Sequence, residues 1–391
     1  MRRIYLDNSA TTPIAPEVIE AMMPYLIEKF GNASSIHYFG QETRAAVDKA
    51  RHQVARLINA RPNEIVFTSG GTEANNLAIR GLLQAGRPDA EPVHVIASAI
   101  EHPAVKNVGE DLEKSGCEVT WLPVYGEGIV RIADVRGAIR PHTRLISVMT
   151  ANNEIGTLQP VAEIGRLVKD LRKTGGKLHF HTDAVQAAGK IPVDVEEIGC
   201  DLLSISGHKI YAPKGIGALY VRRGVRLRSQ NLGGRQERGI RGGTEPVAQV
   251  AAFGRAVELA AENLSADATR LCHLRDRFER RIIEKISGAE VNGSRDVRLP
   301  NISNISFDRI EGEGLLINLD MKGIAVSTGS ACSSGSLEPS PVIRALGRDD
   351  DSARGAIRFS FGRYNTQADV DTVLDVLPAA IDNIRRLNNT A

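Results

Sequence analysis

The chain has 391 residues, of which 42% are hydrophobic and 25% are charged, and its formal net charge is +2. A chain of this length usually forms more than one domain, and a charge this close to zero gives no general attraction to nucleic acid or to anionic membranes. The four cysteines are scattered without a CxxC pair, which argues against a disulfide framework or a zinc ribbon and indicates a reducing compartment. The first residues lack the apolar core of a signal peptide, and no run of about 20 apolar residues could cross a bilayer, so we expect a cytoplasmic protein with no membrane partner.

Strand-like apolar runs alternate with amphipathic helical patterns through the first part of the chain. The helical patterns lie near 41–58, 72–85, 103–116 and 160–174. The strand candidates are 64–69, 93–98, 144–149, 177–182, 202–206 and 216–221. This alternation predicts an α/β fold with a mainly parallel sheet covered on both faces, and such sheets bind ligands at the carboxyl ends of their strands.

A long helical pattern follows from about 246 to 287, with apolar residues at spacings of three and four from Leu271 to Ile282 that indicate one buried stripe. Helical segments and three further strand candidates come after it, at 301–308, 323–328 and 356–362. This tail predicts a second, smaller α+β domain. We expect a large domain over residues 15–255 and a small domain formed by residues 1–14 and 256–391.

The segment SGGTEANN (69–76) follows a strand and opens a helix. Gly70 and Gly71 let the backbone approach a ligand closely, and the free N–H groups of a helix start favour an anion such as a phosphate. Thr72 adds a hydroxyl donor. The alternative is an ordinary helix start with Thr72 as its N-cap. No GKS or GKT follows, so the segment is not a Walker loop.

A lysine follows the buried strand in SISGHKIYAPKGIG (204–217). Lys209 lies there with Ser206 and His208, and desolvation would favour its neutral amine, as Schiff-base chemistry requires. The alternative is a solvated loop lysine paired with a carboxylate, which is how we interpret Lys214.

A carboxylate ends another apolar strand in HTDAVQA (181–187). If buried, Asp183 needs a partner, which could be a pyridinium N–H, an arginine or a helix N-terminus. His179 and His181 share one face of the strand and could mimic a metal pair. No third His or Cys ligand lies nearby, so we expect no metal site.

Three more polar residues follow or interrupt strands. His102 precedes a helix that opens at Pro103, and by itself it is typical of a helix start. Asn153 in NNEIG (152–156) offers a donor at a strand end, or simply forms a turn. Arg358 lies in an apolar strand, where a buried arginine would bind a carboxylate or form an internal salt bridge.

Seven arginines crowd the residues from 222 to 241. No aromatic residues are interleaved with them, and the overall charge is near zero. We therefore favour a solvated or subunit-facing loop over a nucleic-acid surface.

The segment STGSACSSGSLEPS (327–340) places Cys332 among small hydroxyl residues and glycines. Structural cysteines usually lie in apolar cores, because the thiol behaves as a small hydrophobe. This composition instead predicts an exposed thiol on a flexible loop that could enter a site and then leave it.

Together these groups form the set that pyridoxal 5'-phosphate needs when it acts on an amino acid. The sequence resembles the cysteine desulfurases of the class V aminotransferase family, of the NifS/IscS type. The resemblance covers nearly the whole chain in order. Its motifs are YLDNSATT (5–12), GNASS (31–35), SGGTEANN, EHPAV (101–105), NNEIG, DAVQ (183–186), SGHKIYAPKGIG, ERGIRGGT (237–244), GSACSSGSLEPS and RFSFGRYNT (358–366).

The resemblance implies a fold-type I pyridoxal-phosphate transferase with a mainly parallel sheet of the seven-stranded type. It implies catalytic roles for Lys209 as the Schiff-base lysine, His102 as the ring-stacking histidine that can move protons, and Cys332 as the sulfur acceptor. It also assigns residues that bind the cofactor or the substrate. Gly71, Thr72, Ser206 and His208 hold the phosphate, Thr244 reaches the phosphate of a neighbouring subunit, Asp183 pairs with the ring nitrogen, Gln186 contacts the ring oxygen, and Asn153 and Arg358 bind the substrate carboxylate.

The resemblance further implies conversion of L-cysteine to L-alanine, with the sulfur left on Cys332 as a persulfide, in a homodimer. The sulfur would pass to an acceptor protein such as an iron–sulfur scaffold, although thiolated tRNA and molybdenum cofactor routes share this chemistry. Cys332 could also ligate a shared cluster transiently. The alternatives are a selenocysteine lyase or another fold-type I enzyme, and a non-enzymatic sulfur carrier.

The sequence departs from the family at two positions. Ala33 stands where relatives usually have proline, and Arg235 stands where they tend to carry histidine. Arg235 lies near Thr244, so we expect this change to affect subunit contacts or site polarity and not the reaction.

Overall fold

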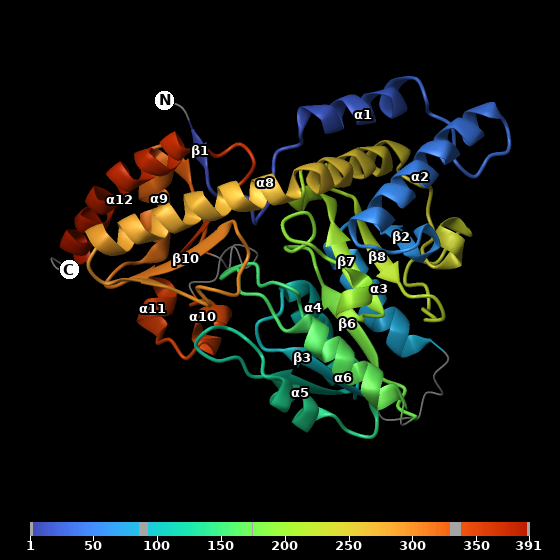
Figure 1. Cartoon of the computed structure of the whole chain (residues 1–391), viewed down its shortest axis with the longest axis horizontal. Helices are drawn as coiled ribbons and strands as arrows, with labels where there is room; N and C mark the ends of the chain where they lie inside the picture. The colour runs from blue at the N-terminus through green and yellow to red at the C-terminus, as the bar shows by residue number, and fades with distance from the viewer. Residues whose placement is uncertain (1–2, 86–92, 174, 329–337, 389–391) are drawn as a thin grey trace.

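The computed structural model describes residues 3–85, 93–173, 175–328 and 338–388. Its largest unit is a seven-stranded sheet with the order β2-β8-β7-β6-β5-β3-β4 (Figure 1). The strands are β2 (Ile65–Thr68), β3 (His94–Ser98), β4 (Glu118–Leu122), β5 (Thr143–Ser147), β6 (His179–Asp183), β7 (Leu202–Ser206) and β8 (Gly217–Val221). Only β8 runs antiparallel to its neighbours, so the predicted mainly parallel α/β sheet is confirmed, and β4 is the one strand of it that the sequence patterns did not predict.

Helices cover both faces of this sheet, because alternate residues of each strand point to opposite faces. In β2, Ile65 and Phe67 pack in the core shared with α2 (Tyr38–Leu57), α6 (Val161–Lys173) and α8 (Val247–Lys285). Val66 packs in the core shared with α3 (Gly71–Gln84) and α4 (Pro103–Lys114). The four predicted helices of this region are all present. The helices are α1 (Pro16–Ile27), α2 (Tyr38–Leu57), α3 (Gly71–Gln84), α4 (Pro103–Lys114), α5 (Ile132–Ala138), α6 (Val161–Lys173) and α7 (Val195–Ile198).

A second unit combines antiparallel strands with helices, as the tail of the sequence predicted. Its three-stranded sheet has the order β12-β10-β9, and β1 pairs with β11 in parallel. Its core joins Leu6 near the N-terminus to Phe278 and Phe359 near the C-terminus. The elements are β1 (Ile4–Tyr5), β9 (Ala289–Val291), β10 (Ile302–Phe307), β11 (Ile324–Ala325), β12 (Ala356–Ser360), α9 (Gly312–Met321), α10 (Pro341–Ala345), α11 (Asp350–Arg354) and α12 (Gln367–Asn388).

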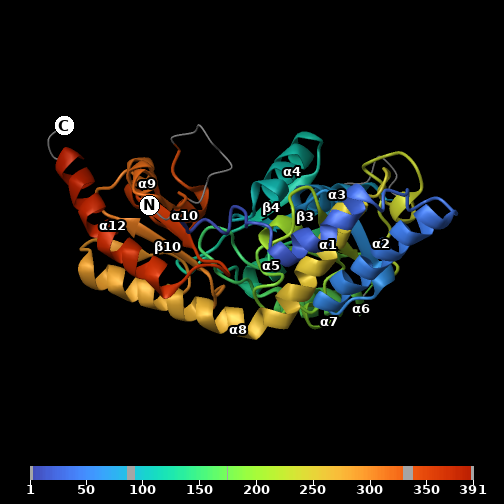
Figure 2. The same ribbon diagram turned by 90° about the horizontal axis from the view of Figure 1, so that it is seen from above.

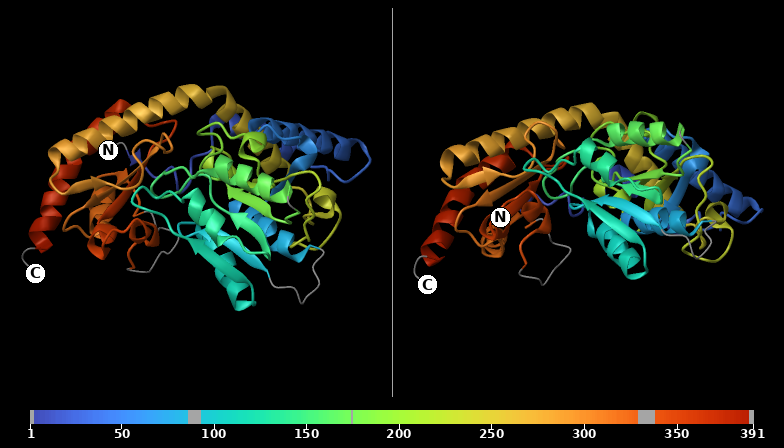
Figure 3. Two further views of the ribbon diagram at one scale, coloured as in Figure 1. Left: turned by 60° about the horizontal axis from the view of Figure 1, so that its bottom comes forward. Right: turned by 90° about the horizontal axis from the view of Figure 1, so that it is seen from below.

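Helix α8 (Val247–Lys285) runs along both units (Figures 2 and 3). Its first half packs in the core of the large sheet, and the predicted stripe from Leu271 to Ile282 packs in the core of the second unit. The predicted boundary between residues 255 and 256 falls inside this unbroken helix and stays a prediction. None of the helices in the described ranges combines the length and the apolar character needed to cross a bilayer.

Candidate active site

A cavity of about 360 Å³ lies at the carboxyl ends of the strands of the large sheet. Its lining comes from both units of the fold, because Arg358 belongs to β12 of the small sheet. Ten of the residues predicted from the sequence line it. They are Gly71, Thr72, His102, Asn153, Asp183, Gln186, Ser206, His208, Lys209 and Arg358.

The start of α3 forms one wall of this cavity. The helix begins at Gly71, with Gly70 at φ 152° as its N-cap and no side-chain cap. The alternative that Thr72 is the N-cap is therefore wrong, and Thr72 is the second residue of the helix. A Cβ on Gly71 would lie 2.8 Å from Cγ2 of Val185, so only glycine fits this close approach. The first N–H groups of a helix have no partner within it, and here they face a site with room for an anion.

Lys209 lies on a short 3-10 turn, Gly207–Lys209, that directly follows β7. Its Nζ donates to the backbone carbonyls of Ser9 and Ala10, at 2.5 and 2.6 Å. The side chain is half-buried and lines the cavity. The alternative of a solvated loop lysine does not describe this environment.

His208 lies on the same turn, and its Nδ1 is 3.2 Å from Oγ1 of Thr11. Burial, together with the positive charges of Lys209 and Lys214, lowers the pKa of His208 to about 4. The imidazole is therefore neutral at neutral pH and offers one N–H donor and one acceptor nitrogen.

Asp183 ends β6 and is buried, and each of its oxygens accepts a hydrogen bond. Nδ2 of Asn75 donates to Oδ2 at 2.6 Å, and the N–H of Val185 donates to Oδ1 at 2.9 Å. Both donors are neutral groups, and neither is the arginine considered from the sequence. A protonated ring nitrogen in the cavity would supply the positive charge that such a carboxylate lacks.

Gln186 is fixed by two neighbours of opposite hydrogen-bonding character. Its Oε1 accepts from Nζ of Lys190 at 2.9 Å, and its Nε2 donates to the carbonyl of Ser9 at 3.0 Å. A lysine amine donates and a carbonyl accepts, so the orientation of the amide is determined. The amide nitrogen therefore faces the carbonyl of Ser9, which also accepts a hydrogen bond from Lys209.

His102 is the N-cap of α4, as its position before Pro103 indicated, and it also lines the cavity. Its catalytic role stays a prediction. Its Nδ1 accepts from the N–H of Ala104 at 3.1 Å, which leaves the ring proton on Nε2. Burial lowers the pKa of His102, against the opposing effect of Asp183, and the charges of Lys209 and Arg358 lower it further. A neutral ring with its proton on Nε2 can stack on a cofactor and exchange that proton.

Arg358 is buried in β12 and forms the internal salt bridge considered as the alternative. Its Nη2 donates to Oδ1 of Asp7 at 2.7 Å, and its Nη1 donates to the carbonyl of Asn153 at 2.9 Å. These contacts hold the guanidinium against the wall formed by Asn153. Binding of a substrate carboxylate by either residue stays a prediction.

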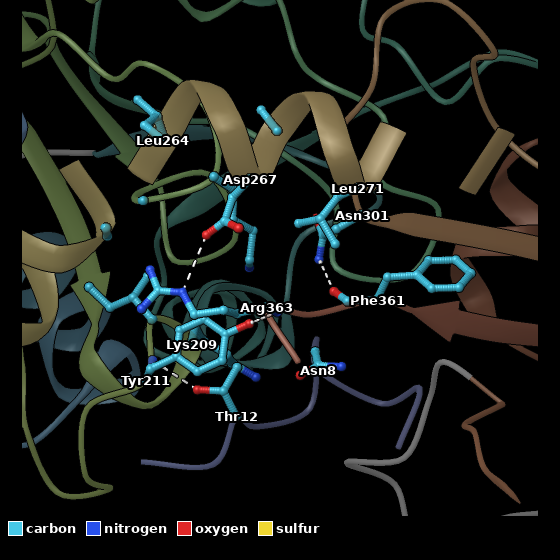
Figure 4. A pocket seen from close by; sticks show the side chains of 15 residues that line it. Asn8, Thr12, Lys209, Tyr211, Leu264, Asp267, Leu271, Asn301, Phe361 and Arg363 are labelled. Atoms are coloured by element: carbon cyan, nitrogen blue, oxygen red, sulfur yellow. Dashed lines mark hydrogen bonds and ion pairs between the residues drawn. The ribbon is translucent and has the colours of Figure 1, made fainter. Parts of the chain in front are cut away.

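A second cavity of about 30 Å³ lies behind Lys209 against α8, with room for a single water molecule (Figure 4). Tyr211 joins its walls: its N–H donates to Oγ1 of Thr12 at 2.8 Å, and its hydroxyl accepts from the N–H of Arg363 at 2.5 Å. Arg363 also pairs with Asp267 of α8 at 3.3 Å. Tyr211 adopts a φ of 68°, which these contacts hold in place. The turn that carries Lys209 is thereby braced against the second unit.

Two of the predicted site residues are not among the lining residues. Thr244 is exposed and lies outside the cavity. Cys332 lies outside the described residues. The described residues on either side of 329–337 contact a lining residue, Arg358, and the neighbour of another, Glu154 beside Asn153. The backbone of Ser327 pairs with that of Arg358, with an N···O distance of 2.7 Å, and Oγ of Ser340 donates to Glu154 at 2.6 Å.

The arginine-rich segment packs on its own protein. Arg241 pairs with Glu73 at 2.8 Å, and Arg222 pairs with Glu196 at 3.0 Å. Burial would raise the pKa of Glu73, but hydrogen bonds from Arg241 and Ser69 outweigh it and lower that pKa. These contacts fit a structural segment better than a nucleic-acid surface.

His181 and Cys200 have structural surroundings. His181 is buried between the hydroxyls of Ser147 and Ser204, at 2.8 and 3.1 Å, and does not join His179 as a metal pair. Burial raises the pKa of the Cys200 thiol, which makes it unreactive.

Sequence reasoning missed several residues that shape the cavity. Asn75 could have been found from the sequence, because it lies in the motif SGGTEANN. Lys190 follows the DAVQ motif by four residues, and Glu101 directly precedes His102. The contacts of Asn75 with Asp183 and of Glu101 with Met149 join residues that are distant in sequence, whereas Lys190 contacts the nearby Gln186.

The aminotransferase class-V family matches residues 4–373. The chain belongs to this family. A cysteine desulfurase IscS of Dictyoglomus turgidum is 49% identical over 387 residues, which cover 99% of this chain and 96% of that protein. A cysteine desulfurase of Trichormus azollae is 49% identical over 388 residues, covering 99% and 95%.

Solved structures agree with these matches. A NifS-like protein aligns with a TM-score of 0.89 and 35% identity over 100% of both chains. A structure described as SspA in complex with cysteine aligns with a TM-score of 0.81 and 37% identity, over 93% of this chain and 100% of that one. The predicted class-V aminotransferase family, fold type and pyridoxal phosphate dependence are confirmed.

The cavity of this class-V aminotransferase fits pyridoxal 5'-phosphate. The start of α3, where a Cβ on Gly71 would not fit, suits the phosphate. Asp183, with two neutral donors, suits the ring nitrogen, and the amide nitrogen of Gln186 suits the ring oxygen. Lys209 is the amine that lies within the same cavity and can bind the aldehyde.

Proposed function

We propose that this protein removes the sulfur atom of L-cysteine, releases L-alanine and carries the sulfur as a persulfide on Cys332. The observation that carries the proposal is one cavity that joins Lys209, Asp183 and the start of α3, in a chain whose relatives named cysteine desulfurase cover 99% of it. Cysteine and a thiol give alanine and a persulfide, so the atoms and electrons balance without another reactant.

Substrate binding falls to the wall that Arg358 and Asn153 form. A guanidinium that is buried and held by Asp7 is a fixed positive group, and an amino-acid carboxylate is its natural partner. The side-chain amide of Asn153 lines the same cavity and can donate to that carboxylate. This pair would orient the substrate with its amine towards Lys209.

Proton transfer falls to Lys209 and His102. Bound pyridoxal phosphate supplies an electron sink for the carbon atoms of the substrate. Lys209, once free of the cofactor, can take the proton from Cα, because its Nζ lies in the same cavity. His102 can relay a proton: it gives up the one on Nε2 and takes that of the Cys332 thiol in its place, and the resulting thiolate is the form that attacks sulfur.

The test is to follow the sulfur. With ³⁵S-cysteine, we expect one label per active site on a peptide that contains Cys332, together with stoichiometric alanine. Cys332→Ala should keep the absorbance of the bound cofactor and lose persulfide formation, whereas Cys117→Ala should behave as the wild type. Label on another cysteine, or undiminished turnover in Cys332→Ala, would refute the proposal.

The alternative reaction is that of a selenocysteine lyase or another fold-type I enzyme. Such an enzyme would not need the thiol of Cys332. Comparing kcat/KM for cysteine and selenocysteine in the wild type and in Cys332→Ala separates the two, because only sulfur transfer should depend on the thiol.

We also propose that the protein acts as a homodimer. A group of exposed apolar side chains on α1, the following loop and the start of α2 supports this, because grouped apolar exposure is typical of a protein interface. It is formed by Ile19, Met23, Leu26, Ile27, Phe30, Ile36, Tyr38 and Phe39. Leu26→Glu should shift the protein towards monomer in sedimentation velocity, whereas Met321→Glu on α9 should not. An unchanged dimer in Leu26→Glu would exclude this surface.

The acceptor of the sulfur is, in this proposal, a protein such as an iron–sulfur scaffold. The name IscS of similar proteins and the free cysteines of this chain support that pathway and a cytoplasmic location. Transfer of ³⁵S from the loaded enzyme to purified candidate acceptors tests the pathway.

A further inference from the structure

Glu101 is a buried carboxyl group beside the cavity to which the mechanism above gives no role. It lies in the turn between β3 and α4, directly before His102, and only 4% of its surface is exposed. Its Oε1 accepts from Oγ of Ser98 at 2.5 Å and from the N–H of Met149 at 2.9 Å. Its Oε2 is buried and has no hydrogen-bond partner among the described residues.

The contacts of Oε1 join two neighbouring strands. Ser98 is the last residue of β3, and Met149 follows β5 by two residues. The two strands pair in parallel, so their ends lie side by side. Nδ2 of Asn152 adds a second tie from the β5 side, since it donates to the carbonyl of Ile100 at 2.9 Å. The turn that carries His102 is therefore held by hydrogen bonds to the segment after β5, in addition to its connection to α4.

The surroundings of Glu101 favour its neutral form. Burial, opposed by the hydrogen bonds of Ser98 and Met149 and supported by the charge of Asp183 on β6, raises the pKa of Glu101 to about 8. Lys209 and Arg358, on the cavity side, act on His102. Asp183 has a donor on each oxygen, whereas Glu101 has both donors on one oxygen and none on the other. The negative charge is thus better accommodated on Asp183.

We propose that Glu101 is a positioning residue: as a neutral acid it fastens the β3–α4 turn to the end of β5, and so sets the ring of His102 over the cofactor. This inference rests on the cofactor site proposed above. A second consequence is that Glu101 adds no negative charge beside Asp183 at the ring-nitrogen end. Ionisation of Glu101 would place a like charge near Asp183 and weaken that arrangement.

The experiment compares Glu101→Gln, which keeps a neutral acceptor, with Glu101→Leu, which removes the tie but fills a similar volume. Near pH 7 we expect Glu101→Gln to keep kcat/KM within about threefold, and Glu101→Leu to lose about tenfold or more while it still binds the cofactor. Ser98→Ala, which removes one of the two donors, should fall between them.

Two readouts do not depend on turnover. The absorbance of the bound cofactor should change with a midpoint near pH 8 in the wild type, and this change should be absent in Glu101→Gln. The infrared difference spectrum of the apoproteins, wild type minus Glu101→Gln, should contain the C=O band of a protonated carboxyl at pH 6 and lose it above pH 9.

The outcomes distinguish a failure of the role of Glu101 from a failure of the proposed function. If the wild type makes no alanine from cysteine, the function fails, while the infrared band still tests Glu101. Absence of that band at pH 6, or full inactivation of Glu101→Gln at every pH, would overturn the neutral acid. Wild-type behaviour of Glu101→Leu in both absorbance and kcat/KM would overturn the positioning role.

Discussion

Lys190 gives a prediction about how stability depends on pH. Its amine donates to the backbone carbonyl of Gln186 at 3.1 Å and to Oε1 of the same residue at 2.9 Å, both neutral acceptors. Burial, followed by the positive charges of Lys209 and Arg358, lowers the pKa of Lys190 from 10.5 to about 7. The perturbation is Lys190→Met, which keeps most of the side-chain volume and removes the titrating amine.

The magnitude follows from the two pKa values of Lys190. The difference between 10.5 and about 7 corresponds to about 5 kcal/mol at 1.36 kcal/mol for each pH unit. Because the side chain is half-buried, solvent screening reduces this figure, and we expect about 2 kcal/mol or more. The folded-state pKa lies below the unfolded one. The free energy of unfolding of the wild type is therefore highest above the unfolded pKa of Lys190, and it falls as the pH is lowered towards the folded pKa.

The assay is urea unfolding of the apoproteins at several pH values between 7 and 10, since bound cofactor would add its own stabilisation. The free energy of unfolding of the wild type, relative to Lys190→Met, should rise across this range. Lys214→Met is the matched control, because Lys214 is exposed, and its difference from the wild type should stay constant. A difference for Lys190→Met that stays flat or falls with pH would refute the reasoning.

Two further predictions concern buried hydrogen bonds to carboxylates. Asn75→Ala removes the 2.6 Å donor to Asp183, so cofactor affinity should fall about tenfold in an absorbance titration, and unchanged affinity would contradict the role of this pair. Glu237 accepts from both Nη atoms of Arg51 at 2.7 Å and from the N–H of Phe67 at 3.1 Å. Glu237→Gln should therefore lower the free energy of unfolding by about 3 kcal/mol or more, and a loss below about 1 kcal/mol would show that the pair contributes little.

The location of the site could be predicted because the large sheet is mainly parallel. Asp183 and Ser206 end strands that the apolar runs identified, and parallel strands bring their carboxyl ends to one edge. The strand β4 was missed because it lies at the edge of the sheet. Most of its residues are partly exposed, so its apolar signal is weak.

The partners of the site residues could not be predicted from motifs. Glu101 contacts the segment after β5 only because β3 and β5 become neighbours, with β4 on the outer side of β3. The N-cap of α3 could not be assigned from the motif either: the structure has Gly70 there and not Thr72, and Val185, which approaches Gly71 closely, is more than 100 residues away. Spacing in the sequence carries no information about either contact.

Three titratable groups near the cavity share one physical feature, which is that burial favours their neutral forms. It lowers the pKa of His102 and of His208 and raises that of Glu101. Fewer charges then compete within a poorly solvated space, and each remaining charge acts more strongly because screening is weak. The carboxylate of Asp183 can in this way dominate the potential at the ring nitrogen. The neutral neighbours are therefore as much a part of the electrostatic arrangement as the charged residues that motifs reveal.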